Sequence, residues 1–175
     1  MSDYEDLFTY NADTGDLIWK VRPPSHFKSK NAWSMWNTKY SSRAAGWKAR
    51  TRRGGKPQAP QISVFGKLIY LHRIVWEMNR GPIPTGMVID HVNRNPIDNR
   101  IQNLRLATLS DNARNCATRS RHGLKGITKT ASGKWVAQIT VNRRNIRIGS
   151  FLTKGLAAAA YAKEAIRYHG QFARF

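Results

Sequence analysis

The chain has 175 residues, with 30 lysines and arginines against 10 aspartates and glutamates, which gives a formal charge of +20 at pH 7. This excess of positive charge favours a polyanionic partner, and the 41% apolar residues, with six Trp, six Tyr and six Phe, exclude disorder throughout. The single Cys116 excludes an intramolecular disulfide framework and a zinc site built from several cysteines.

The charge is unevenly distributed along the chain. No acidic residue occurs between Asp16 and Glu77, or between Asp111 and Glu164, whereas these stretches hold thirteen and eleven basic residues. The pattern predicts two phosphate-contacting surfaces with a cation-binding position between them, and a merely solvated basic surface is the alternative. From the first stretch we expect Arg50, Arg52 and Arg53 to bind DNA.

The first 80 residues contain three recognisable elements. Turn-forming residues inside LFTYNADTGDLIWKV (7–21) predict a small hairpin, and residues 22–58 show no dominant period and are expected to be irregular and partly ordered. ISVFGKLIYLH (62–72) reads as two strands around residues 65–67. HRIVWEMN (72–79) follows as a short helix that Gly81-Pro82 ends.

The segment after residue 86 is expected to contain a strand, a loop, a strand and a helix. We predict strands Met87–His91 and Leu104–Ala107, a polar loop over 92–102 between them, and a helix that begins after Thr108 with Asp111 in its first turn. Residues 118–122 are basic and suit a linker. Alternation over 134–141 and 145–151, followed by an Ala-rich helix that Gly170 ends, predicts a three-stranded sheet with one packed helix.

Asp90 and His91 stand together at the end of an apolar strand, where consecutive side chains point to opposite sides of the backbone. A nuclease must activate water and stabilise the charge that develops on the phosphate. A neutral histidine can serve as the base, and a hard divalent cation with oxygen ligands can stabilise the charge. Asn112 offers a carbonyl oxygen for Mg²⁺, which takes few protein ligands.

The sequence DHVNRNPIDNRIQNLRLATLSDNARN, preceded by YLHRIVWEMNRGPIPTGMVI, resembles the HNH endonuclease family, in particular phage and intron-encoded homing endonucleases, from about Leu71 to Asn115. The resemblance implies the ββα-metal fold, with His91 as general base, Asp90 and Asn112 as metal ligands, and Asn103 as a residue that braces the loop. Asn112 replaces the histidine that often binds the metal, and Asn115 is an alternative ligand. For His72 we favour a packing or phosphate contact over chemistry.

The C-terminal segment KGITKTASGKWVAQITVNRRNIRIGSFLTKGLAAAAYAKEAIRYHG resembles the AP2 DNA-binding domain, which implies a sheet that reads the major groove. Alternation places Trp135, Ala137, Ile139, Ile146 and Ile148 against the helix, with Trp135 in the core. We expect DNA contacts from the residues of the open face and its neighbours: Lys125, Thr128, Thr130, Lys134, Gln138, Thr140, Arg143, Arg144, Asn145 and Arg147. The base-reading residues of plant AP2 domains are not kept at these positions.

Together these features predict an α+β protein with a ββα-metal (His-Me finger) nuclease domain over 1–117 and an AP2-like domain over 123–175. We expect a site-preferring endonuclease of double-stranded DNA that uses one Mg²⁺ or Mn²⁺, without a small-molecule cofactor, as a monomer or a weak dimer on DNA. The competing functions are a DNA-binding regulator with a decayed HNH scaffold and an RNA-binding protein. No apolar run reaches the roughly 20 residues that span a bilayer, and no basic signal start is present, so we expect a soluble, cytoplasmic protein, in the bacterial host if it comes from a phage.

Overall fold

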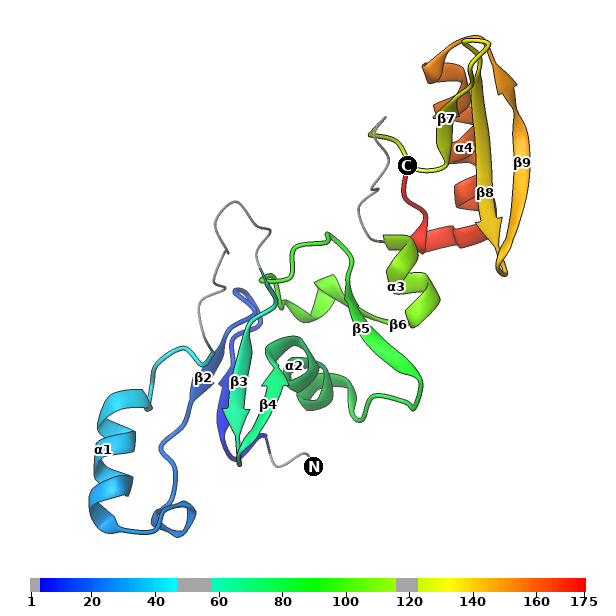
Figure 1. The fold of residues 1–175 in the computed structure, drawn as a ribbon. Coiled ribbons are helices and arrows are strands. Elements are labelled where there is room, and N and C mark those ends of the chain that lie inside the picture. The colour runs from blue at the N-terminus through cyan, green and yellow to red at the C-terminus, as the bar shows by residue number, and fades with distance from the viewer. Residues whose placement is uncertain (1–3, 47–57, 116–122) are drawn as a thin grey trace. The chain divides into compact units, whose positions relative to one another are not determined.

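The computed structural model describes residues 4–46, 58–115 and 123–175 of the chain (Figure 1). It divides into two compact units, one ending at Ala107 and the other beginning at Thr108. This division falls before the helix at 109–115, which the sequence assigned to a first domain ending at residue 117. The expected linker, 118–122, lies outside the described residues.

Two antiparallel hairpins contribute to the first unit, and both agree with the sequence prediction. In the first, β1 (Phe8–Tyr10) pairs with β2 (Leu17–Trp19), so that Phe8 lies opposite Trp19. In the second, β3 (Gln61–Val64) pairs with β4 (Lys67–Tyr70) around a turn at Phe65 and Gly66. Gly66 has φ +77°, a conformation that glycine adopts without steric cost.

The core of the first unit forms where α2 (Leu71–Arg80) packs against these hairpins. The predicted short helix is confirmed: Leu71, Ile74 and Val75 are all buried on one side of it, and Gly81 follows its end. One apolar cluster joins α2 to both hairpins and to the strands that follow: Leu7, Phe8, Leu17, Trp19, Ala45, Ile62, Val64, Leu71, Ile74, Val75, Ile89 and Leu104.

The expectation of an irregular segment was wrong for residues 30–40, which form α1 (Lys30–Tyr40) after a single 3₁₀ turn at Pro24–His26. The Ser29 side chain caps the helix by accepting a hydrogen bond from the Ala32 amide at 3.2 Å. Trp36 packs edge-on against Trp19, 4.8 Å between ring centroids. The helix is therefore stabilised by contacts with distant residues that its own sequence period does not show.

Two paired strands complete the first unit and lead into the second. β5 (Met87–His91) pairs with β6 (Leu104–Thr108), and the loop between them ends in a 3₁₀ turn at Ile101–Asn103. These bounds agree with the predicted strands within one residue. The loop itself is polar, as expected, and its structure is described with the site below.

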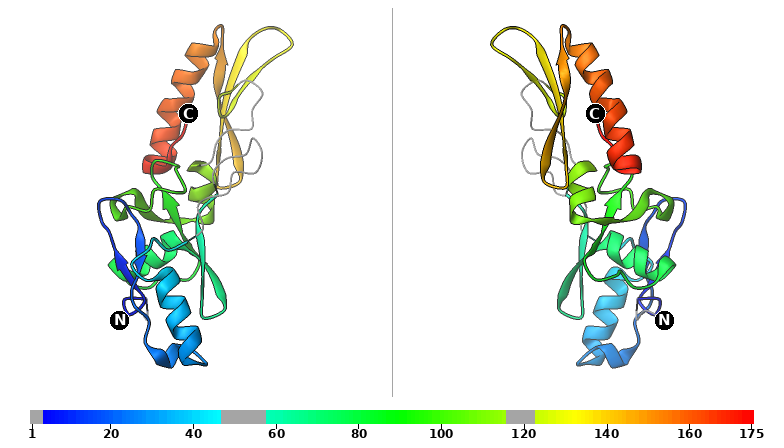
Figure 2. Two further views of the ribbon diagram at one scale, coloured as in Figure 1. Left: turned by 90° about the vertical axis from the view of Figure 1, so that its left-hand side faces the viewer. Right: turned by 90° about the vertical axis from the view of Figure 1, so that its right-hand side faces the viewer.

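The second unit holds α3 (Leu109–Asn115), the antiparallel strands β7 (Ile127–Lys129), β8 (Trp135–Val141) and β9 (Arg144–Phe151), and α4 (Lys154–His169) with a 3₁₀ turn, η3 (Gly170–Phe172). The strand order is β7-β8-β9. Figure 2 shows α4 running along one face of this sheet. Ala137 and Ile139 of β8 are buried against Ala157, Tyr161 and Ala165 of α4, which confirms the predicted three-stranded sheet with one helix.

One predicted core position differs in this sheet. Ile146 pairs with buried Ile139 but is 38% exposed, because it lies on β9 at the edge of the sheet. Trp135 and Ile148 pack against the core as expected. Within the described ranges, no helix is long and apolar enough to cross a membrane.

Candidate active site

Asp90 and His91 are both buried at the end of β5, with 5% and 8% of their surfaces exposed. The Asp90 carboxylate is held by Arg105 of the paired strand β6, with Oδ2 at 2.9 Å from Nε and 2.8 Å from Nη2. Burial of a carboxylate is costly unless a positive group accompanies it, and Arg105 is that group. The pairing of β5 with β6 therefore places a neutralised negative charge beside His91.

His91 is oriented by Asn99, a residue of the loop between β5 and β6. Nε2 of His91 and Oδ1 of Asn99 are 3.1 Å apart, and Asn99 is only 3% exposed. Burial lowers the pKa of His91 below its ordinary value, against the opposing effects of the Asn99 hydrogen bond and the charges of Asp90 and Asp98. His91 is consequently neutral near pH 7, the form that can accept a proton.

A second histidine, His72 of α2, lies against His91 with its ring edge-on, 5.1 Å between centroids. The pKa of His72 falls to about 3, first because the ring is buried and then because of the charges of His91 and Arg73. Its Nδ1 is buried without a hydrogen-bond partner among the described residues. His72 is thus a neutral neighbour of His91, and its expected packing or phosphate contact stays a prediction.

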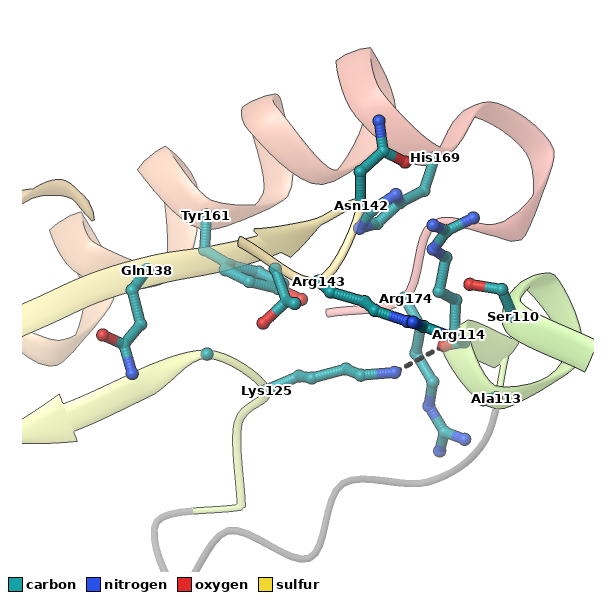
Figure 3. Close-up of a pocket in the computed structure, with 12 residues that line it drawn as sticks. Ser110, Ala113, Arg114, Lys125, Gln138, Asn142, Arg143, Tyr161, His169 and Arg174 are labelled. Carbon is teal, nitrogen blue, oxygen red and sulfur yellow. Dashed lines mark hydrogen bonds between the residues drawn. The ribbon is translucent and has the colours of Figure 1, made fainter. Parts of the chain in front are cut away.

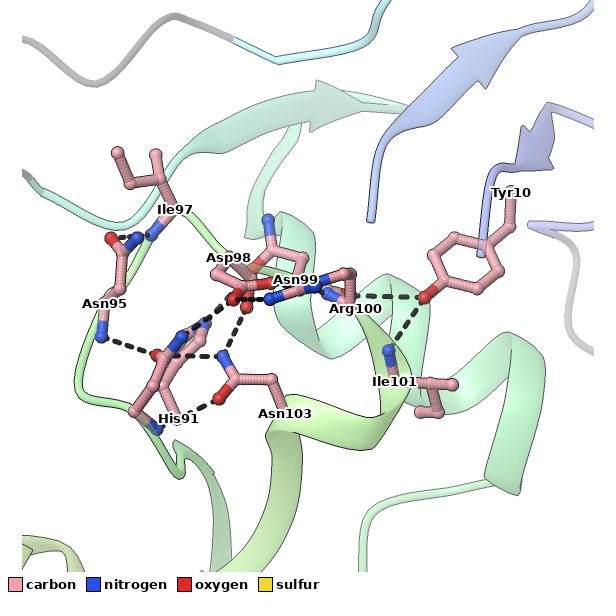
Figure 4. A network of polar contacts seen from close by, with 10 residues as sticks. Tyr10, His91, Asn95, Ile97, Asp98, Asn99, Arg100, Ile101 and Asn103 are labelled. Atoms are coloured by element: carbon pink, nitrogen blue, oxygen red, sulfur yellow. Dashed lines mark hydrogen bonds and ion pairs between the residues drawn. The ribbon is translucent and has the colours of Figure 1, made fainter. Parts of the chain in front are cut away.

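The loop that carries Asn99 is closed by a network of side-chain hydrogen bonds (Figure 4). Asn103 donates from Nδ2 to the Asp98 carbonyl at 2.7 Å and to Oδ1 of Asn93 at 3.0 Å, and its own Oδ1 accepts from the Asn93 amide at 2.9 Å. Asp98 accepts from Asn93 Nδ2 at 2.7 Å and pairs with Arg100, which lowers the pKa of Asp98 to about 2. Asn103 and Asn93 thus hold together the loop that positions Asn99.

The N-terminal hairpin supports the same loop from outside. The Tyr10 hydroxyl accepts a hydrogen bond from the Ile101 amide at 2.8 Å and donates one to the Asn99 carbonyl at 3.4 Å. Gly15 lies so close that a Cβ there would stand 2.5 Å from the Arg100 nitrogen and 2.6 Å from the Asn99 carbonyl carbon. Residues about 90 positions apart in sequence therefore fix the backbone at Asn99.

The expected metal ligands lie in different units. Asp90 belongs to the first unit, whereas Asn112 and the alternative Asn115 lie on α3 in the second. No group of three or more His, Cys, Asp and Glu side chains that could hold a metal occurs in the part of the chain that the structure describes. A pair made of one carboxylate and one amide is smaller than such a group. It suits Mg²⁺, which usually keeps several waters and binds through one or two protein carboxylates. The ligand role of Asn112 stays a prediction.

The expected DNA-binding residues fall into two groups. Arg50, Arg52 and Arg53 lie outside the described residues. In the second unit Lys125 and Thr130 are half-buried, and the remaining positions are exposed: Thr128, Lys134, Gln138, Thr140, Arg143, Arg144, Asn145 and Arg147. Thr140 and Asn145 are joined to each other, since Thr140 Oγ1 donates a hydrogen bond to Asn145 Oδ1 at 2.6 Å. The sheet therefore presents a polar and basic face.

Four residues with a part in this site were not singled out for it in the sequence. Asn99 and Arg105 lie in the stretch that resembles the HNH pattern, so the motif itself carried their signal. Asn93 braces the loop through its contacts with Asn103 and Asp98. Tyr10 had no local signal, because its partners lie in a different part of the sequence.

Comparison with known proteins relates part of this sequence to a known family. A family model described as HNH endonuclease matches residues 69–114. The chain is 36% identical over 114 residues to Protein 3.8 of Escherichia phage T7, covering 63% of this chain and 93% of that protein. The chain contains an HNH endonuclease domain and is a relative of Protein 3.8. The matched HNH segment contains Asp90, His91, Asn99, Asn103 and Arg105.

Two further similarities accompany this assignment. An uncharacterised HNH endonuclease of Acanthamoeba polyphaga mimivirus, L560, is 32% identical over 120 residues, which cover 68% of this chain and 63% of that protein. The solved structure described as "DNA binding and cleavage by the HNH homing endonuclease I-HmuI" aligns with 93% of this chain and 85% of its own, at 15% identity and a TM-score of 0.38. The AP2-like character of the C-terminal unit stays a prediction.

Proposed function

We propose that this HNH protein is a metal-dependent endonuclease that hydrolyses phosphodiester bonds of double-stranded DNA at a preferred site. The observation that carries the proposal is the buried pair Asp90 and His91, in which His91 is held by Asn99 and kept neutral by its surroundings. A structural protein gains little from burying a carboxylate and a histidine side by side, because both groups lose hydration. A metal-dependent nuclease can use both, the histidine as general base and the carboxylate as metal ligand.

His91 would act as the general base. When Oδ1 of Asn99 accepts a hydrogen bond from Nε2–H of His91, the other ring nitrogen, Nδ1, carries the lone pair that can take a proton from water. The base must be neutral and correctly oriented before the substrate arrives, and the Asn99 contact supplies the orientation. Asn103 would contribute indirectly, by bracing the loop on which Asn99 lies.

Asp90 and Asn112 would hold one Mg²⁺ or Mn²⁺ ion. When bound, such an ion polarises a phosphoryl oxygen and stabilises the charge on the leaving oxygen. The ion pair of Asp90 with Arg105 is compatible with this role, because an ionised carboxylate offers about four acceptor positions on two oxygens. This arrangement corresponds to the ββα-metal fold, which we propose for β5, β6 and α3.

DNA as the substrate is supported by charge. The formal charge of +20 is large for 175 residues, and the second unit exposes Arg143, Arg144 and Arg147 on or beside one sheet. A sheet face of this kind can enter a major groove. The proposed general base and the loop that orients it lie in the first unit, so we assign site preference to the sheet of the second.

The decisive experiment is a plasmid-nicking assay with Mg²⁺, with Mn²⁺ and with EDTA, on the wild-type chain, His91→Ala and the control His26→Ala. We expect nicking that requires the metal, a loss of about 10²- to 10⁴-fold in His91→Ala, and little change in His26→Ala. The affinity for DNA, measured in EDTA, should be the same for all three proteins. A wild-type protein that binds DNA but never nicks it would favour the alternative, a DNA-binding regulator with an inactive HNH scaffold.

A further inference from the structure

A pocket of about 330 Å³ lies within the second unit, beside the part of β8 that extends beyond its pairing with β7 (Figure 3). Four cationic side chains line it: Arg114 of α3, Lys125 before β7, Arg143 of the β8–β9 turn, and Arg174 near the C-terminus. None of the described residues that line it is an Asp or a Glu. Elements from both ends of the unit therefore bring four positive charges to one concave surface.

Three of these cations are anchored by the helix α3. Lys125 Nζ donates to the Arg114 carbonyl at 2.5 Å, and Arg174 Nη1 donates to the Asn115 carbonyl at 3.0 Å. These carbonyls end the helix, where the backbone dipole favours positive charge. Arg114 itself pairs with Asp111 at 2.6 Å. Helix capping thus accounts for the placement of Lys125 and Arg174 but leaves Arg143 unexplained.

Arg143 has no ion pair within the part of the chain that the structure describes, and it adopts φ +64° beside Asn142 at φ +49°. A two-residue turn of this type strongly prefers glycine at the second position. An arginine here keeps the backbone strained and brings a positive charge to the pocket. Backbone strain of this kind is common at functional sites.

The field inside the pocket is positive. His169 lines it, and its Nδ1 is buried without a hydrogen-bond partner among the described residues. Burial lowers the pKa of His169, and the charges of Arg114 and Lys125 lower it further. An anion that enters would therefore meet positive charge, together with the hydroxyl group of Ser110.

We propose that this pocket binds a phosphate group of the DNA backbone. Gln138 and Thr140 of the exposed sheet face also line it, so the pocket is continuous with the face assigned to DNA binding. A strand lying across that face would place a phosphate between Arg143, Arg114 and Lys125. The choice of DNA as the source of the phosphate rests on the proposed function, whereas the affinity for phosphate does not.

The test uses the full-length protein in EDTA and measures its affinity for a fluorescein-labelled 30-bp duplex as a function of NaCl concentration. Arg143→Gln is compared with Arg167→Gln, which removes the same charge from a side chain on α4 that is 70% exposed and not part of the pocket. We expect the slope of log K against log salt to flatten by about 0.9 in Arg143→Gln, because one phosphate of the duplex is no longer neutralised. The slope of Arg167→Gln should equal that of the wild type.

Replacing NaCl by sodium phosphate at equal ionic strength gives the second readout. Phosphate should displace the duplex from the wild type more effectively than chloride does, and this difference should shrink in Arg143→Gln. Arg143→Gly, which suits the turn, should reproduce both effects without loss of thermal stability. Equal slopes for Arg143→Gln and Arg167→Gln would overturn the proposal. Phosphate competition that depends on Arg143 with no change of slope would also overturn it, because the pocket would then hold a free anion. If the wild type shows these effects but does not nick DNA, the pocket stands and the proposed nuclease function fails.

Discussion

Replacing Tyr10 by Phe tests whether the N-terminal hairpin supports the catalytic loop. The change keeps the aromatic ring and removes only the hydroxyl, which accepts from the Ile101 amide at 2.8 Å and donates to the Asn99 carbonyl at 3.4 Å. Both partners belong to the loop that orients His91 through Asn99. The substitution therefore perturbs His91 by removing two hydrogen bonds from this loop, and it leaves the charge unchanged.

The magnitude follows from these two bonds. An amide that loses its partner in a buried place costs about 1–3 kcal/mol, and the low end applies because Tyr10 and Ile101 are only half-buried. The 3.4 Å bond is long and adds at most about 0.5 kcal/mol. We therefore expect the free energy of unfolding to fall by about 1–2 kcal/mol. If a similar energy is lost in positioning His91, the nicking rate falls by roughly 5- to 30-fold, since about 1.4 kcal/mol corresponds to tenfold.

Urea unfolding and single-turnover nicking of Tyr10→Phe measure the two effects, and Tyr40→Phe is the control in the same unit. Tyr40 is 37% exposed, and removal of its hydroxyl should leave both quantities unchanged. A Tyr10→Phe protein with wild-type stability and wild-type rate would refute the argument that the hairpin holds the loop. A loss of stability with an unchanged rate would restrict the hairpin to a structural role.

Two further predictions concern the same site. Gly15→Ala should destabilise the first unit by more than about 1–2 kcal/mol and reduce nicking, because φ at Gly15 is +80° and the added Cβ would collide with the backbone of Asn99 and Arg100. Gly66→Ala is the control for the cost of the positive φ alone, because a Cβ at Gly66 would meet nothing within 4 Å. Equal losses of stability in the two variants would exclude the collision. The unfolded state binds a proton at His72 near pH 6.5, whereas the folded state does so only near pH 3, so the stability that depends on His72 is greatest above pH 6.5. The free energy of unfolding should fall by about 1.5–2 kcal/mol between pH 6.5 and 5. Urea titrations of His72→Phe should show a flatter dependence of stability on pH, and an identical profile would show that His72 does not titrate as proposed.

Local patterns predicted most of the secondary structure around the site. The spacing of Leu71, Ile74 and Val75 placed α2, and Gly81-Pro82 ended it. The apolar run before Asp90 placed β5 and brought Asp90 and His91 to its end. These features depend on neighbours within a few residues, so a single sequence contains them.

Contacts between distant residues were not predictable in the same way. The packing of Trp36 on Trp19 stabilises α1, but nothing within 30–40 indicates a partner at position 19. The contact of Asn99 with His91 lies within the segment that resembles the HNH pattern, whereas the contact of Tyr10 with Ile101 spans 91 residues. Such contacts follow from how the hairpins pack on α2, which periodicity does not specify.

The assignment of α3 illustrates a different kind of difference. Thr108 and Asp111 begin the helix as predicted: the Thr108 hydroxyl accepts from the Asp111 amide at 3.1 Å and donates to its carboxylate at 2.7 Å. The end of the helix belongs with the C-terminal unit, because Lys125 and Arg174 bind its last carbonyls. The motif that spans 69–114 is therefore shared between the two compact units.

The ion pair of Asp90 with Arg105 connects the composition of the chain to its site. Buried ion pairs contribute little net stability, because desolvation offsets their attraction, yet this pair is nearly covered, with side chains 6% and 13% exposed. The pair is better explained by the proposed chemistry, in which a negative charge is kept beside a neutral base and a fixed arginine on the neighbouring strand compensates it. Under the proposed function, Arg105 would hold the Asp90 carboxylate in place from the neighbouring strand, which would give one of the thirty basic residues a role that the net charge alone does not reveal.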